Sequence, residues 1–227
     1  DFHMNDSGVY ITPASRGASH TSTALARLDE NGSASYTFDL EWAPTAPIEV
    51  PETAQIIEAG SISAIIEPGA SAVLDALARG REHALIFFDP NARPSIMGEP
   101  TAALASLERF IALADVVKVS DEDIDWLTGG APVDEVVDRW LGMGVSLVVV
   151  TRGKHGSDVT TASGLRFTKT PSDVPVVDTV GAGDSFMGGM IDAMWGMGLR
   201  GAEVREALRT LPEEQVRAII DRASAVS

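Results

Sequence analysis

The sequence predicts an α/β fold in which helices cover both faces of a mainly parallel sheet. From residue 51 onward, short apolar runs typical of strands alternate with amphipathic segments typical of helices, which favours parallel strand–helix–strand units. The chain has 227 residues and 44% of them are hydrophobic, so it can bury a sizeable core. Residues 1–50 show a different, β-like pattern. We therefore predict a small β segment over residues 1–50 and an α/β core over residues 51–227.

A β-hairpin is the first predicted element, within the segment STALARLDENGSASYTFDLEW. Two alternating runs flank Asn31 and Gly32, and both of these residues tolerate the positive φ of a tight hairpin turn. Prolines then separate the hairpin from the α/β region, at Pro44, Pro47 and Pro51.

The α/β region alternates between apolar runs and amphipathic segments along its whole length. The apolar runs predict strands over residues 55–62, 84–90, 115–120, 145–153, 156–163, 165–170 and 174–180. The amphipathic segments predict helices over residues 70–80, 101–114, 121–130, 133–144 and 184–195. The first of these strands is apolar enough to be buried, and Gly80 marks the end of the helix that follows it.

The composition excludes several classes of partner. Seventeen basic residues against thirty-three acidic ones give a formal net charge of -16, which repels nucleic acid and anionic membranes. The chain contains no cysteine, so disulfides and thiolate metal sites are excluded. No apolar run is long enough to cross a bilayer, and the first residues lack the pattern of a signal peptide. These properties predict a soluble, cytoplasmic protein.

The stretch VVDTVGAGDSFMGGM joins an apolar run to a helix through a glycine loop. Gly181 and Gly183 let the backbone approach a ligand closely, and we expect Gly183 to need a positive φ. The helix behind them directs free N–H groups at the same place, which is the arrangement of an anion hole. A dinucleotide fingerprint fails at Phe186, and a Walker A loop fails at Val148 and His155. Taken alone, an ordinary helix start with an acid that complements the helix dipole explains the loop equally well.

The residues around this loop resemble a known family. The run DTVGAGDSF, followed by the small residues Gly188 and Gly189, resembles the second signature of the PfkB, or ribokinase-like, sugar kinases. In the same order, FDPNARP resembles the D-P-N-x-R segment of fructokinase-like members. KVSDEDIDWL resembles the N-x-x-E segment, and VVVTRGKHGS resembles the T-x-G-x-x-G nucleotide segment. The resemblance runs from about Thr23 to the end of the chain. It implies a three-layer αβα sandwich with a small β lid.

The resemblance assigns roles within the glycine loop. Asp184 matches the catalytic base that accepts the proton of the substrate hydroxyl. The amides of Gly181, Ala182 and Gly183 match the anion hole that stabilises the transferred phosphoryl group. Asp178 and the carbonyl of Val180 match part of a monovalent-cation site, which implies K⁺ as a further cofactor.

A second group of candidates follows the strand ALIFFDP. Asp89, Asn91 and Arg93 alternate, so their side chains point the same way if the chain stays extended. Alone, this segment is typical of a polar turn. Beside the kinase signature, we expect Arg93 to offer charge to a phosphate and Asn91 to form a hydrogen bond at the transfer site. We expect Asp89 to position the other groups.

The segment SDED departs from the family, because Ser120 replaces the usual asparagine and Asp123 replaces the usual glutamate. In one interpretation Ser120 caps a helix and the acids complement its dipole. In the other, Ser120 contacts ATP and Asp123 helps to hold hydrated Mg²⁺ through water. Both interpretations stay open. The resemblance also assigns ATP binding to the turn that contains Thr151, Gly153 and Gly156.

Together these features predict an ATP- and Mg²⁺-dependent kinase that phosphorylates a primary hydroxyl of a sugar, with fructose as the favoured acceptor. Ribose, 2-keto-3-deoxygluconate and a nucleoside stay open as acceptors. A nucleotide-binding protein without turnover and an NAD-dependent oxidoreductase are the rival functions. Family members often pair through their lids, which implies a homodimer.

We also expect this chain to be part of a functional enzyme. It begins almost at the lid hairpin and stops at RASAVS, inside an apparent helix. A sheet without its first strands would expose an apolar edge. If residues are missing from the sequence, the full protein should be an active kinase. If they were lost from the gene, residues 1–227 should bind sugar poorly and turn over little.

Overall fold

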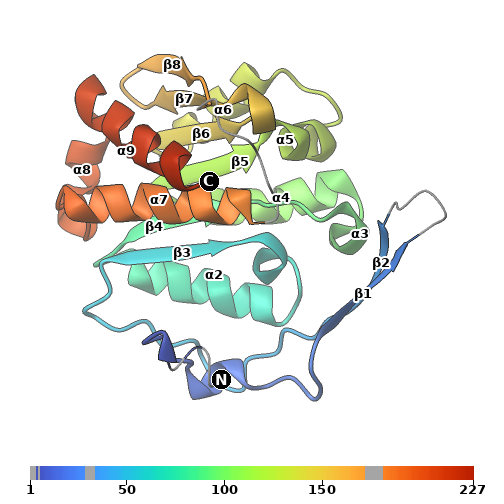
Figure 1. Cartoon of the computed structure of the whole chain (residues 1–227). Coiled ribbons are helices and arrows are strands. Elements are labelled where there is room, and N and C mark those ends of the chain that lie inside the picture. The colour runs from blue at the N-terminus through green and yellow to red at the C-terminus, as the bar shows by residue number, and fades with distance from the viewer. Residues whose placement is uncertain (1–3, 5, 29–33, 172–180) are drawn as a thin grey trace.

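A six-stranded sheet forms the middle layer of the computed structural model, which describes residues 4, 6–28, 34–171 and 181–227 (Figure 1). The strands lie in the order of the chain: β3 (Ile56–Gly60), β4 (Leu85–Asp89), β5 (Val116–Ser120), β6 (Leu147–Thr151), β7 (Ser157–Thr161) and β8 (Arg166–Lys169). Strands β3 to β6 are parallel, whereas β7 and β8 continue the sheet as antiparallel strands. The predicted mainly parallel sheet is therefore confirmed. The strand predicted over residues 174–180 lies outside the described residues.

Strands β4, β5 and β6 are mostly apolar because helices cover both of their faces. Every residue of β4 is buried, as are the first four residues of β5 and of β6. The prediction that β3 is a buried strand was wrong, since Ala59 is the one buried residue among its five. Within the described residues β3 forms one edge of the sheet, with β4 as its neighbour, so it is covered less completely.

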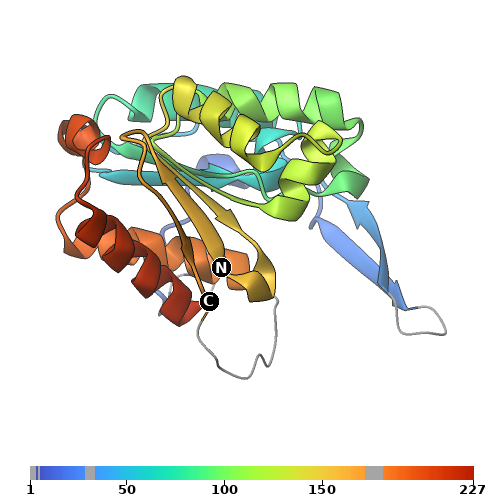
Figure 2. The ribbon, with the colours of Figure 1, turned by 90° about the horizontal axis from the view of Figure 1, so that it is seen from above.

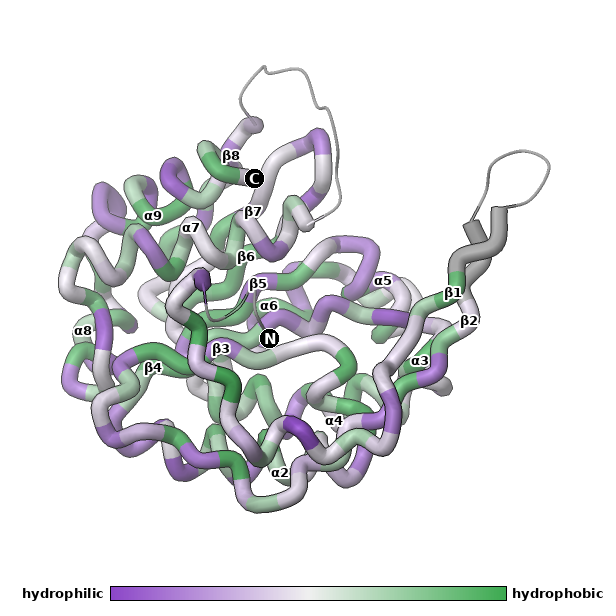
Figure 3. The backbone as a smooth tube through the Cα atoms, turned by 60° about the horizontal axis from the view of Figure 1, so that its bottom comes forward, coloured by the Kyte–Doolittle hydropathy of each residue, from purple (hydrophilic) through white to green (hydrophobic). Residues whose placement is uncertain are grey.

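Helices occupy both faces of the sheet, so the fold has three layers (Figure 2). One face carries α2 (Gly69–Gly80), α4 (Pro100–Ile111), α5 (Asp121–Thr128) and α6 (Val133–Gly142). The other face carries α7 (Ala182–Gly196), α8 (Arg205–Leu208) and α9 (Glu213–Val226). Hydrophobic and hydrophilic colours alternate along α9 in Figure 3, as expected for a helix with one face on the core. Shorter helical turns complete the chain: η1 (Pro13–Ser15), η2 (Ser61–Ala64), α3 (Pro94–Met97), η3 (Gly153–His155) and η4 (Ala202–Val204).

Two helix ends show how the local sequence sets the boundaries. The side chain of Ser120 accepts a hydrogen bond from the backbone N–H of Asp123 and so caps α5. Helix α2 ends at Gly80 as predicted, and this glycine also lies close to β3, since a Cβ at this position would lie 2.3 Å from Cδ1 of Ile57. An added Cβ would require the end of the Ile57 side chain to move, so Gly80 favours close packing of α2 on β3.

The predicted hairpin forms a separate two-stranded sheet of β1 (Thr23–Leu28) and β2 (Ala34–Asp39). The strands are antiparallel, with Thr23 opposite Asp39 and Leu28 opposite Ala34. The hairpin projects from the body of the fold (Figure 1). Its predicted turn at Asn31 and Gly32 lies outside the described residues. Among the described helices, none has the length and apolar character needed to cross a membrane.

Candidate active site

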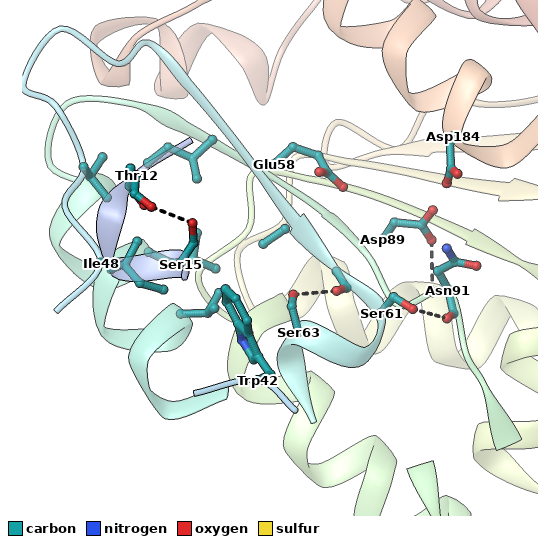
Figure 4. Close-up of a pocket in the computed structure, with 17 residues that line it drawn as sticks. Thr12, Ser15, Trp42, Ile48, Glu58, Ser61, Ser63, Asp89, Asn91 and Asp184 are labelled. Atoms are coloured by element: carbon teal, nitrogen blue, oxygen red, sulfur yellow. Dashed lines mark hydrogen bonds between the residues drawn. The ribbon is translucent and has the colours of Figure 1, made fainter. Parts of the chain in front are cut away.

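A cavity of about 490 Å³ opens beside the carboxyl ends of β3 and β4 (Figure 4). Its apolar wall comes mainly from β3 and α2, and Trp42 also lines it. Several polar side chains gather at the end of the cavity where the strands stop, and they include Glu58, Asp89, Asn91 and Asp184. Ligands of open α/β sheets bind at this edge, beyond the carboxyl ends of the strands.

Asp184 reaches the cavity from the first turn of α7. Gly181 precedes this helix with a φ of 76°, a left-handed conformation that favours glycine. Ala182, Gly183 and Asp184 are the first three residues of α7, so their amides lie among those that have no acceptor within the helix. The expectation that Gly183 needs a positive φ was wrong, because that conformation belongs to Gly181. Asp184 therefore stands beside a helix start that favours anions.

A buried ion pair lies behind this part of the cavity. Nζ of Lys118 is 2.5 Å from Oδ2 of Asp89, and the two side chains are each 6% exposed. The other carboxylate oxygen of Asp89, Oδ1, accepts the backbone N–H of Asn91 at 3.1 Å. Burial raises the pKa of Asp89, and the attraction of Lys118 opposes part of that rise. Asp89 thus links β4 to β5 and fixes the start of the loop that follows it.

Glu58 brings a further carboxylate to the cavity from β3. Figure 4 shows its carboxylate directed toward the same space as those of Asp89 and Asp184. The side chain is open to solvent through the cavity, yet the surrounding protein withdraws enough water to raise the pKa of Glu58. Repulsion from Asp89 and then from Asp184 raises this pKa further, whereas Lys118 lowers it. The carboxylates are therefore close enough to influence one another.

The loop after β4 turns sharply rather than staying extended. Asn91 has a φ of 37°, and Ser61, whose side chain donates to the Asn91 carbonyl at 3.0 Å, has a φ of 54°. Left-handed conformations of residues other than glycine are strained and cluster at functional sites. Because of this turn, Asn91 lines the cavity beside Asp89, but exposed Arg93 folds back and donates to Oδ1 of Asn91 at 2.7 Å. The extended geometry expected for these three residues is therefore wrong.

Ser120 and Asp123 connect α5 to the same loop. Besides the cap, Oδ1 of Asp123 accepts the backbone N–H of Ala92 at 3.1 Å. Burial raises the pKa of Asp123, and hydrogen bonds from Ser120 and Ala92 oppose that rise. The capping interpretation is thus present in the structure. The role of Asp123 beside hydrated Mg²⁺ stays a prediction.

Thr151 is the last residue of β6, and Gly153 and Gly156 follow it, next to the end of β5. Ser120 and Thr151 are partners in the β5–β6 ladder, which brings these two candidates together. Gly153 begins η3 with a φ of 50°, and Gly156 has a φ of 90°. A Cβ on Gly156 would lie 1.9 Å from the Lys169 carbonyl oxygen, so this glycine permits the close approach of the two segments.

Six of the candidate side chains fall into three groups. Asp89, Asn91 and Asp184 line one cavity, Ser120 and Thr151 adjoin at the ends of β5 and β6, and Arg93 contacts Asn91 at the surface. Asp178 and Val180 lie outside the described residues. Within the part of the chain that is described, no cluster of three or more histidine or acidic side chains is arranged to hold a metal ion.

Sequence reasoning gave no role to Glu58 or Lys118. Each is an ionisable residue within a mainly apolar strand segment. Glu58 is the acidic residue of QIIEAGSI, and Lys118 is the basic residue of DVVKVS. Charged residues are rarely placed on buried strands unless they are paired, so this was the signal that could have identified them.

Comparison with known proteins gives a family match over most of the chain. The profile described as "pfkB family carbohydrate kinase" matches residues 2–210. A fructokinase of Rhizobium leguminosarum bv. trifolii is 36% identical over 171 residues, which are 72% of this chain and 52% of that protein. A fructokinase of Vibrio alginolyticus is 30% identical over 177 residues, which are 75% of this chain and 57% of that protein. The chain thus spans about half the length of these relatives.

Solved structures share the fold. The fructokinase of Vibrio cholerae O395 with fructose, ADP and calcium ion bound gives a TM-score of 0.71 at 27% identity, over 98% of this chain and 70% of that chain. The fructokinase of Xylella fastidiosa with bound ATP gives a TM-score of 0.80 at 25% identity, over 97% of this chain and 70% of that chain. The predicted ribokinase-like sandwich with an added hairpin is therefore confirmed.

Proposed function

The chain belongs to the pfkB family of carbohydrate kinases, and from this premise we propose that the protein carrying it transfers the γ-phosphate of ATP to a primary hydroxyl of fructose. The observation that carries the proposal is the position of Asp184. This carboxylate faces a cavity from the first turn of α7, directly beside the amides of an anion-binding helix start.

The reaction needs a proton acceptor and a place for the charge of the transferred group. In our proposal Asp184 accepts the proton of the sugar hydroxyl while the hydroxyl oxygen forms a bond to the γ-phosphorus. The bond between that phosphorus and the β–γ bridging oxygen breaks, and ADP leaves with the bond's electron pair. The amides of Gly181, Ala182 and Gly183 stabilise the negative charge on the phosphoryl oxygens during this step.

The remaining candidates surround this centre. Arg93 releases Asn91 and contacts phosphate, which its exposed position allows. The nucleotide lies over the turn formed by Thr151, Gly153 and Gly156, next to Ser120. Asp123 would hold hydrated Mg²⁺, which when bound would neutralise charge on the nucleotide phosphates. We keep Asp178 and the Val180 carbonyl as the proposed site of a monovalent cation such as K⁺.

Fructose is the proposed acceptor for two reasons. The segment FDPNARP has the form found in fructokinase-like sequences, and both curated relatives described above are named fructokinases. The cavity beside Asp184 has an apolar wall with several hydroxyl and carboxyl groups at its polar end, a lining suited to a small polyol.

The test measures ADP formation by the natural protein that carries this sequence, with Mg-ATP and a panel of acceptors. The panel contains fructose, ribose, 2-keto-3-deoxygluconate and a nucleoside. We expect fructose to give the highest kcat/KM. If another sugar gives the highest kcat/KM, the proposed acceptor is wrong but the proposed kinase reaction is supported. ATP binding without turnover on any acceptor would indicate a nucleotide-binding protein, and binding of NADH but not ATP would contradict the kinase altogether.

A further inference from the structure

Lys118 occupies an unusual position for a lysine. The chain has three lysines, Lys118, Lys154 and Lys169. Lys154 is exposed and Lys169 pairs with Asp221 on the surface, whereas the side chain of Lys118 is 6% exposed in the middle of β5. Withdrawing an ammonium group from water is costly unless anions and hydrogen-bond acceptors compensate it. A buried lysine at the edge of a candidate active site therefore needs an explanation.

The compensation in the structure is incomplete. Among the described residues, Asp89 is the hydrogen-bond acceptor of Nζ, so two of the three N–H groups of this ammonium have no acceptor there. The start of α7 lies on another side of Nζ, because a Cβ on Gly183 would be 2.8 Å from it. A helix start carries partial positive charge, which disfavours a neighbouring cation. Asp89 is thus the carboxylate that accepts a hydrogen bond from this ammonium, whereas Glu58 and Asp123 attract it through charge alone.

A phosphoryl group would complete this arrangement. It carries several oxygens that accept hydrogen bonds, and its negative charge would be attracted both by the ammonium and by the amides at the start of α7. Asp89, which lines the cavity, keeps Nζ at this place when the phosphoryl group is absent. Gly183 has no side chain, so the ammonium of Lys118 can occupy the space beside it. This is a second role for Gly183, in addition to the contribution of its backbone amide to the anion hole.

We propose that Lys118 is a catalytic residue that contacts the terminal phosphoryl group of the nucleotide during transfer. This inference rests on the proposed kinase function and deepens it. Lys118 forms and breaks no covalent bond and keeps its proton throughout. Its ammonium donates hydrogen bonds to phosphoryl oxygens, which carry more negative charge while the group passes from ADP to the sugar oxygen.

The test compares two nucleotides that differ in the terminal phosphoryl group. Calorimetric titration with the ATP analogue AMP-PNP and with ADP is performed on the natural protein and on Lys118→Met. We expect Lys118→Met to weaken AMP-PNP affinity by about 10- to 100-fold, because the variant loses a hydrogen bond to the charged terminal phosphoryl group. ADP lacks this group, so its affinity should change by less than about threefold. We expect kcat to fall by about 100-fold. Lys169→Met is the matched control and should change neither affinity.

Each other outcome has a definite meaning. Unchanged AMP-PNP affinity and kcat in a folded Lys118→Met would overturn the inference and leave the proposed kinase intact. Equal loss of AMP-PNP and ADP affinity would also overturn it, because that result indicates a structural role. If Lys118→Met does not fold, the double variant Asp89→Asn with Lys118→Met, which removes both buried charges, must show the same selective loss. A natural protein that binds neither nucleotide would overturn the proposed function, and this inference with it.

Discussion

Asp184 is the residue on which the proposed chemistry depends most directly. We predict that Asp184→Asn lowers kcat by at least about 100-fold and leaves ATP affinity nearly unchanged, because the amide cannot accept the proton while the glycine loop stays intact. Steady-state kinetics and nucleotide titration measure the two effects separately. Asp192→Asn, on an exposed face of the same helix, is the control and should retain normal kcat. A near-normal kcat in Asp184→Asn would remove the assignment of the base.

Glu58 shows how the cavity affects stability through charge. Its pKa is raised by burial and by repulsion from Asp89 and Asp184, so the ionised form is less favourable in the folded protein than in the unfolded chain. The folded state then binds more protons than the unfolded state between the two pKa values, and stability falls as pH rises through this window. The cost is fully present above the folded-state pKa and disappears below the unfolded one.

We therefore predict that Glu58→Gln raises the melting temperature at pH 8, and that the gain shrinks as pH falls toward the ordinary glutamate range. Thermal melts between pH 4 and pH 8 measure the difference from the natural protein. Glu52→Gln, at an exposed position, controls for the loss of one negative charge and should show little dependence on pH. A gain in Glu58→Gln that is the same at every pH would contradict the electrostatic cause.

At the scale of single elements, the start of α7 combines close packing with anion binding. We predict that Gly183→Ala lowers activity more than stability, because its Cβ would lie 2.8 Å from Nζ of Lys118 and displace that ammonium. Gly188→Ala is the matched control on the same helix, since an added Cβ there meets no atom within 4 Å. It should stabilise the helix by up to about 1 kcal/mol. Equal kcat in the two variants would show that the space beside Gly183 is not required.

The β1–β2 hairpin is a second element whose stability depends on contacts beyond its own two strands, since isolated two-stranded hairpins are marginally stable. Leu25 on β1 is 53% exposed, which suits a contact with a second copy of the chain. If the hairpins pair between protomers, as the family resemblance implies, Leu25→Asp should convert the dimer to a monomer in light-scattering measurements. Ala24→Asp places the same charge on the opposite face of β1, and the dimer should remain intact in this variant. A natural protein that is monomeric would end this proposal.

At the scale of the whole molecule, one arginine joins the layers of the fold. Arg205 of α8 donates through Nε to Oδ1 of Asp115 at 2.7 Å and through Nη2 to the carbonyl oxygens of Arg81 and Ala84. Asp115 is fully buried, and its Oδ2 accepts the backbone N–H of Ile86 at 2.8 Å. The helical layer that contains α8 is thereby fastened to the sheet, and through Arg81 to the end of α2.

We predict that Arg205→Met lowers the free energy of unfolding by roughly 3 kcal/mol, because it leaves the buried Asp115 carboxylate without its closest cation. Urea unfolding measures the change. Arg222→Met breaks an exposed pair with Asp192 and should cost less than about 1 kcal/mol. Similar losses in both variants would mean that burial of Asp115 does not determine the effect.

The sequence by itself determined the order of the described elements and named Asp89, Asn91 and Asp184, which line the cavity. Apolar runs such as LIFFD and VVKVS could be assigned as strands because burial on both faces leaves little place for polar residues. The glycine loop was recognisable because a strand, a tight turn and a helix start leave a local pattern. Burial of β3 could not be predicted this way, since an edge strand and a central strand differ in their neighbours rather than in their own residues.

The tertiary structure decided which charges meet. Glu58, Asp89, Lys118 and Asp184 come from β3, β4, β5 and α7, so their proximity depends on strand order and on helix packing. Asp89 and Lys118 are joined across neighbouring strands, and Glu58 responds to three charges that are distant in sequence. Such contacts leave no local pattern, because electrostatic interactions act through space between groups that only folding brings together.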